Sequence, residues 1–432
     1  MSEHSAAAGA VGEVEQALTE SFRTDWGRVV AALIGMTRDW DLAEECAQDT
    51  FATALSSWRR DGVPDRPLGW LLTTARNRAI DRIRRDRVGD AKLRELAAVT
   101  APQPEVDLDA LVSGVADDRL RLLFTCCHPA LAFEAQVTLA LRTLCGLTTT
   151  EIARAFLVGE QTMAKRLVRT KQKITAAGIP YRVPPAHRLP ERTTAVLGVL
   201  YLLFNEGYAA SAGPDLIRRE LCEQAVRLAA LVAEQMPDHP EAAGLHALLL
   251  LLDARSAARV DATGALVPLE EQDRSRWNAA MIDAGVTELR RALEHERPGP
   301  YQLQGLIAAC HATTARAQDT DWTRIVALYD QLHALVPSTT IRLNRAVAIA
   351  MASGPQTGLD LLDHLTATGE ITDHPLLPAV RADLLRRLDR PSEAAAAYRL
   401  AIQRTDNRTE RAYLARRLTE CMKHEEPDNS DP

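Results

Sequence analysis

The amino-acid sequence predicts an all-α protein. Aromatic residues make up only 4% of the chain and hydrophobic residues 46%, and Ala, Leu and Arg are abundant. These residue types lose little conformational freedom on entering a helix, so they favour helices over strands. A chain of 432 residues with this hydrophobic content is expected to fold into two or three domains with ordinary cores.

Charge and cysteine usage limit the classes of protein to consider. The formal net charge is −7, yet two short stretches are strongly basic, which suits a protein that meets DNA only when correctly placed. The seven cysteines form no C-x-x-C pair, so neither a disulfide framework nor a zinc ribbon is indicated. With no signal-peptide pattern and no apolar run long enough for a bilayer, we expect reduced thiols, a cytoplasmic location and no membrane contact.

The chain divides where helical patterns break. The segment GIPYRVPP disrupts helices repeatedly, and Gly89, Pro102 and Pro104 lie in a stretch of weak periodicity. We therefore expect a flexible N-terminus at residues 1–15, a first helical block at 16–88, a linker at 89–115, a second helical block at 116–180, a helical extension at 181–424 and a disordered tail at 425–432.

The extension contains a repeated pattern. Small or apolar residues at positions i, i+4 and i+7, followed by proline at i+12, occur from Ala225 and from Ile325. Weaker copies start at Gly358 and Ala394, so the last three copies start 33 and 36 residues apart. This spacing is similar to that of tetratricopeptide repeats and predicts a solenoid of stacked helix pairs. The alternative is chance matching within amphipathic, Ala-rich helices.

An acidic helix is expected at DLAEECAQDTFATAL, residues 41–55. Asp41 and Glu44 have the spacing of a capping box, and a stripe of apolar residues predicts one buried face. Four polar residues are expected on the other face: Glu44, Glu45, Gln48 and Asp49. Taken alone, the segment favours a solvated acidic surface.

An arginine-rich helix follows at PLGWLLTTARNRAIDRIRRDR, where Pro67 occupies a favoured first helical position. Six arginines accompany only two aspartates within twelve residues. Such a helix repels itself unless solvent or phosphate balances the charge. DNA contact explains the pattern better than a solvated face, because guanidinium groups neutralise phosphates while Asn77 and Asp81 lie among them.

The stretch TTTEIARAFLVGEQTMAKRLVRTKQKI predicts a helix-turn-helix. The first helix is expected at about residues 149–156, the turn at 157–159, and the second helix from about Glu160. Met163, Leu167 and Ile174 are expected in the core. The outward row comprises Thr162, Arg166, Arg169 and Lys173, with Lys165 beside it. A recognition helix places such a row in the major groove, although a plain amphipathic hairpin with a basic flank has the same pattern.

Together the two blocks resemble extracytoplasmic-function RNA polymerase sigma factors. DLAEECAQDTF with PLGWLLTTARNRAIDRIRRDR is similar to region two of that family, and the helix-turn-helix is similar to region four. CCHPAL, GIPYRVP and YLLFNEGY further resemble the subgroup that carries a long tetratricopeptide-like C-terminal extension. The resemblance implies a sigma factor that directs polymerase core to promoters, and we expect its extension to regulate that activity.

The resemblance also implies roles for individual residues. Docking on a coiled coil of the largest polymerase subunit falls to Glu44, Glu45, Gln48, Asp49 and Phe51. Contact near the minus-ten element falls to Asn77, Asp81, Arg84 and Arg85. Reading of the minus-thirty-five element falls to Thr162, Lys165, Arg166 and Arg169. The loop before Pro67 corresponds to the family's capture site for a flipped base, but the sequence does not identify the capturing residue.

Other functions fit less well. A helix-turn-helix regulator with a helical-repeat sensor domain is the main alternative, and a repeat scaffold with incidental basic helices is another. Neither needs the acidic helix followed by the arginine helix. No nucleophile elbow, H-E-x-x-H or phosphate loop occurs, so we expect no enzyme activity and no cofactor. We also expect no metal at Cys126-Cys127-His128, because adjacent ligands on a helix diverge.

The sequence leaves open whether the extension contacts the sigma regions within the same chain.

Overall fold

The protein is described by a computed structural model. It covers residues 2–91, 118–156, 158–210, 212–213, 215–294, 298–371 and 374–425. The described chain is all-α, as predicted, apart from two strands of two residues each. It forms two compact units, residues 1–199 and 200–432. The predicted linker lies almost entirely outside the described residues, and its first three residues end a helix.

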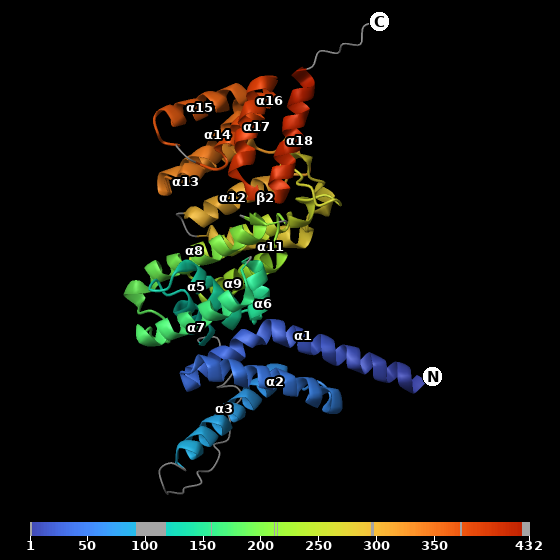
Figure 1. Ribbon diagram of the computed structural model, residues 1–432, viewed down its shortest axis with the longest axis vertical. Helices are drawn as coiled ribbons and strands as arrows, with labels where there is room; N and C mark the ends of the chain where they lie inside the picture. Colours follow the sequence, from blue (N-terminus) through green and yellow to red (C-terminus); the bar gives the residue numbers. More distant parts are fainter. Residues whose placement is uncertain are drawn as a thin grey trace. The chain divides into compact units, whose positions relative to one another are not determined.

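The first helical block consists of three helices that pack on one another (Figure 1): α1 (Ser2–Thr37), α2 (Trp40–Asp61) and α3 (Pro67–Ala91). Residues 2–15, for which a flexible N-terminus was predicted, belong to α1 in the structure. Trp26, Phe51 and Trp58 are buried in this bundle, and Pro67 opens α3 as expected.

The start of α2 differs from the prediction. Asp39, not Asp41, is the N-cap, and its side chain accepts hydrogen bonds from the backbone amides of Asp41 and Leu42. An N-cap carboxylate must precede the first free amides of the helix, and the helix begins two residues earlier than the capping-box spacing suggested. Glu44 is therefore not a capping residue and is available for another interaction.

The second helical block comprises a helix at residues 118–126 followed by α5 (Phe133–Thr143), α6 (Thr149–Ala155) and α7 (Glu160–Ala176). The predicted helix-turn-helix is present as α6 and α7. Thr148 caps α6 in a capping box with Glu151, which fixes where the motif starts. Residue 157 of the predicted turn lies outside the described residues.

The extension begins within α8 (Leu189–Tyr208), because the two units divide between residues 199 and 200. The predicted boundary lay about twenty residues earlier, where the chain is indeed non-helical. The helices that follow are α9 (Arg219–Gln235), α10 (Pro240–Asp253), α11 (Ala279–Ala292), α12 (Pro300–Ala312), α13 (Trp322–Leu335), α14 (Thr339–Ser353), α15 (Pro355–Ala367), α16 (Leu377–Arg387), α17 (Pro391–Arg404) and α18 (Arg408–Glu425).

From α9 to α18, successive helices of the extension pack on their neighbours, as stacked helix pairs require (Figure 1). The repeat positions lie on the inward faces of α9, α13, α15 and α17. Buried examples are Ala225, Ala229, Val232, Ile325, Leu332, Leu362, Leu365, Ala394, Tyr398 and Ala401. The amphipathic pattern thus gives the packing faces of the repeats.

The start and the end of the extension are joined. Strands β1 (Ala212–Gly213) and β2 (Asp406–Asn407) pair in parallel, with Ala212 opposite Asp406. The buried side-chain amide of Asn407 donates hydrogen bonds to the carbonyl oxygens of Ala210 and Asp215, at 3.0 and 3.1 Å. This contact between residues far apart in sequence has no signal in a helical pattern.

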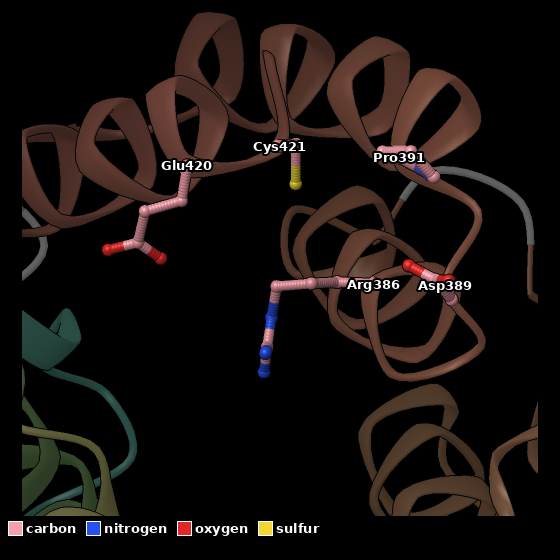
Figure 2. Close-up of a pocket in the computed structure, with 5 residues that line it drawn as sticks. All are labelled: Arg386, Asp389, Pro391, Glu420 and Cys421. Carbon is pink, nitrogen blue, oxygen red and sulfur yellow. The ribbon is translucent and has the colours of Figure 1, made fainter. Parts of the chain in front are cut away.

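A small pocket lies where α16 and α17 meet α18 (Figure 2). Its volume is about 180 Å³, and it is lined by Arg386, Asp389, Pro391, Glu420 and Cys421. Arg386 pairs with Asp383 at 2.6 Å, and Glu420 pairs with Arg417 at 3.0 Å. Arg386 and Glu420 therefore have protein partners, whereas the exposed carboxylate of Asp389 forms no ion pair within the described residues.

Candidate functional site

The second helix of the helix-turn-helix, α7, has one buried and one exposed face. Met163, Leu167 and Ile174 are buried, as predicted. On the opposite face Thr162, Lys165 and Arg169 are exposed and Arg166 is half-buried. The positively charged side chains of this face form no ion pair with any carboxylate in the described part of the chain. Their charge is therefore available to an external anion such as DNA phosphate.

The arginines of α3 fall into two groups. Arg78 lies 3.7 Å from Asp49, and Arg82 lies 2.5 Å from Glu45, so both neutralise the acidic side of α2. From the sequence, only solvent or phosphate was expected to balance the charge of this helix, but Asp49 and Glu45 balance these two arginines.

The remaining group on α3 is open to solvent. Asn77, Asp81, Arg84 and Arg85 are all exposed, and they are the residues to which the resemblance assigned minus-ten contact. The side chain of Arg87 lies outside the described residues. On α3, Arg78 and Arg82 therefore pair with carboxylates of α2, whereas Arg84 and Arg85 face solvent.

The predicted docking residues of α2 do not share one exposed face. Glu45, Gln48 and Asp49 are exposed, as expected. Phe51 is buried in an aromatic cluster, with its ring centroid 5.1 Å from that of Phe22 and 5.9 Å from that of Trp26. Phe51 lies on the predicted apolar stripe of α2, and in this conformation it is part of the hydrophobic core.

Glu44 is also buried, contrary to the outward position that the sequence predicted. Its side chain is 8% exposed and pairs with Arg142 at 2.9 Å and with Lys171 at 2.8 Å. The side chains of Arg142 and Lys171 are each only 14% exposed, and Lys171 also lies 2.8 Å from Asp41. We call Glu44, Arg142 and Lys171 the Glu44 ion cluster. It joins α2 of the first block to α5 and α7 of the second.

Further contacts surround the Glu44 ion cluster. The indole nitrogen of Trp26 donates to the carbonyl oxygen of Arg142 at 3.3 Å, and the Tyr181 hydroxyl donates to the carbonyl oxygen of Ala31 at 2.8 Å. A Cβ at Gly27 would lie 2.5 Å from the carbonyl oxygen of Leu144, so the close approach of α1 to the end of α5 requires glycine. The two blocks are thus in close contact around a buried charge.

The cysteines of the second block are core residues. Cys126 and Cys127 are fully buried, and burial raises the pKa of the Cys127 thiol to about 12. A thiol of that pKa is protonated at neutral pH and is a poor metal ligand. Within the described residues, no group of three His, Cys, Asp or Glu side chains could hold a metal ion.

Sequence reasoning missed Arg142, Lys171 and Tyr181. Arg142 and Lys171 lie 98 and 127 positions from Glu44, and no local pattern links them to it. Tyr181 is the aromatic residue of the GIPYRVP segment, but nothing in that segment indicates which groups its hydroxyl would contact.

Two family matches cover separate parts of the chain. Residues 23–88 match the family described as Sigma-70 region 2. Residues 192–293 match the family described as "Family of unknown function (DUF6596)". The first match covers the end of α1, all of α2 and α3 as far as residue 88, and it identifies this block as a region of the sigma class of transcription initiation factors.

Several relatives extend this result. The chain is 42% identical over 394 residues to an uncharacterized protein of Rhizobium meliloti, covering 90% of this chain and 92% of that protein. It is 30% identical over 161 residues to the ECF RNA polymerase sigma factor SigK of Mycobacterium tuberculosis and Mycobacterium bovis, covering 36% of this chain and 82% of SigK. No solved structure matches.

This chain belongs to the extracytoplasmic-function (ECF) family of RNA polymerase sigma factors, and it carries a long C-terminal extension. Its partners are therefore RNA polymerase core and promoter DNA. Sigma factors act in transcription initiation and are not enzymes. No helix in the described part of the chain has the length and apolar character needed to cross a membrane.

Removal of the Glu44 charge is predicted to weaken the contact between the two blocks. Glu44→Gln leaves Arg142 buried without a counter-charge and Lys171 with only the exposed Asp41, which should lower the free energy of unfolding by about 3 kcal/mol. Urea denaturation of the full chain measures this. Glu45→Gln is the matched control. Its exposed pair with Arg82 should contribute less than about 1 kcal/mol, and equal losses for the two variants would contradict the buried role of Glu44.

Proposed function

We propose that this sigma factor docks through α2 on the coiled coil of the largest polymerase subunit. Glu45, Gln48 and Asp49 support the proposal because they are exposed next to one another on α2. Glu44 belongs to the same docking surface, and its burial against Arg142 and Lys171 of the second block means that this surface is only partly available in the compact form. Phe51, assigned to the same surface, is instead buried by Phe22 and Trp26 of the first block. Docking therefore requires region four to separate from region two.

Promoter contact follows from the two exposed basic surfaces. Asn77, Asp81, Arg84 and Arg85 on α3 contact the minus-ten element. Thr162, Lys165, Arg166 and Arg169 on α7 read the minus-thirty-five element in the major groove. The observation that carries this proposal is the face of α7 opposite its buried row, where the cationic side chains form no ion pair with any described carboxylate.

The extension regulates the sigma regions, through contact with them or with polymerase. The fusion of sigma regions to this extension also occurs in the relative from Rhizobium meliloti, which the match covers over 92% of its length. Repeat arrays of stacked helices commonly bind protein segments on their extended surfaces. A fused extension acts at a high effective concentration on its own sigma regions.

Substitution of a groove-facing arginine tests the minus-thirty-five assignment. Arg169→Ala should weaken promoter binding by holoenzyme about tenfold or more if the guanidinium forks onto guanine, since such a contact contributes about 1–3 kcal/mol. Discrimination among bases at one promoter position should relax as well. Electrophoretic mobility shifts with promoter variants measure both effects. Arg399→Ala, an exposed arginine of α17, is the control. An Arg169→Ala holoenzyme with unchanged affinity and base preference would contradict the assignment.

Removal of the extension tests its regulatory role. A chain that ends after residue 208 keeps α8 whole and lacks the remaining helices of the array. We expect run-off transcription with core polymerase to change several-fold in either direction relative to the full chain. Co-purification with core polymerase checks that the shortened chain still docks. Unchanged promoter-selective transcription by a shortened chain that docks normally would remove the regulatory proposal.

A further inference from the structure

A group of arginines gathers in the extension between α10 and α12. Arg255 and Arg259 flank the short 3₁₀ turn η2 (Ser256–Ala258), and Arg274 begins the turn η4 (Arg274–Arg276). The guanidinium carbon of Arg255 lies 5.9 Å from the ring centre of Trp277, and that of Arg274 lies 4.5 Å from the same ring. Two cations therefore share one indole. We call these four residues, Arg255, Arg259, Arg274 and Trp277, the arginine cluster.

The arginine cluster has no carboxylate paired directly with it, although Asp319 is near enough to act electrostatically on Arg274, and Glu410 on Arg259. Within the described chain, neither Arg255, Arg259 nor Arg274 forms an ion pair with a carboxylate. His311 beside them adds no anion, and burial together with the charges of Arg255 and Arg274 lowers its pKa to about 4. Several guanidinium groups in a partly buried place without a counter-ion repel one another.

Structural roles account for only some of these side chains. Arg274 donates to the carbonyl oxygens of His311 and Thr314, each at 2.6 Å, and Arg259 donates to the carbonyl oxygen of Tyr208. Arg255 is different. It is 7% exposed, its buried Nε has no hydrogen-bond partner, and no other hydrogen bond of its side chain exists within the described residues.

Trp277 supplies a second unmatched donor. The residue is 7% exposed, and its indole N–H is buried without an acceptor among the described residues. Two buried donors in contact with each other, and both without acceptors, are unusual because each unsatisfied donor costs about 1–3 kcal/mol. An external acceptor within reach of both groups would satisfy them.

We propose that the arginine cluster binds the phosphate group of a small metabolite, with Arg255 and the indole N–H of Trp277 as its direct donors. A phosphate dianion balances more of the positive charge than a carboxylate, and it accepts bidentate hydrogen bonds from guanidinium. Arg255 and Trp277 are each only 7% exposed, which favours a small molecule over a rigid protein surface, and Arg259 and Arg274 beside them are half-buried. The binding of phosphate does not depend on whether the extension regulates transcription.

Thermal unfolding of the full chain in inorganic phosphate tests the proposal. At constant ionic strength, phosphate should raise the melting temperature, while chloride and acetate should not, because a ligand that binds only the folded state stabilises it. Arg255→Met should remove this phosphate response and should melt at or above the wild-type temperature in phosphate-free buffer, since an unbalanced buried charge is gone. Arg399→Met, an exposed arginine outside the cluster, should behave like the wild type.

Three results would overturn the proposal. One is an Arg255→Met variant that keeps the full phosphate response. Another is an Arg255→Met variant that melts lower than the wild type by the same amount in every buffer, which indicates a purely structural arginine. The third is equal stabilisation by acetate, which excludes the phosphate class. If Arg255→Met does not fold, the indole N–H resonance of Trp277, assigned with Trp277→Phe, should shift when the wild type is titrated with phosphate. No shift would also overturn the proposal.

Discussion

The Glu44 ion cluster is the interaction on which the compact form of the sigma regions depends. Glu44 holds Arg142 and Lys171, so one carboxylate joins α2 to both α5 and α7. A buried ion pair adds little stability compared with apolar packing, but its loss leaves uncompensated charges and is costly. Such a contact strongly favours one arrangement of the two blocks. It can still be broken when the same side chains pair with charged groups of another molecule.

Under the docking and promoter contacts proposed above, this arrangement conflicts with promoter recognition. A sigma factor must present its minus-ten and minus-thirty-five surfaces at the separation set by the duplex, and polymerase must hold them there. Opening the duplex costs a few kcal/mol per unstacked step, and the chain shows no motif for ATP binding. Binding energy from core polymerase and from both DNA contacts therefore has to open the duplex and also separate the two regions.

Local patterns predicted the helices and their buried faces well. Met163, Leu167 and Ile174 on α7 follow the helical period, and their burial could be read from spacing alone. The same reasoning failed for Glu44, because an acidic residue beside an apolar stripe is assigned to solvent unless a distant cation is known. The pairing of Arg78 and Arg82 with α2 failed for the same reason. The cap of α2 was wrong because Asp39 and Asp41 are both good N-caps, and sequence alone did not decide between them.

Zero-length carbodiimide cross-linking measures the central claim directly, because it converts a carboxylate–ammonium ion pair into an amide. In the free protein, Lys171 should become linked to the peptide that carries Asp41 and Glu44, as both carboxylates lie 2.8 Å from its Nζ. Added core polymerase should abolish that product, since docking on α2 requires region four to leave. A cross-link that is absent from the free protein, or one that persists undiminished in the holoenzyme, would contradict this account.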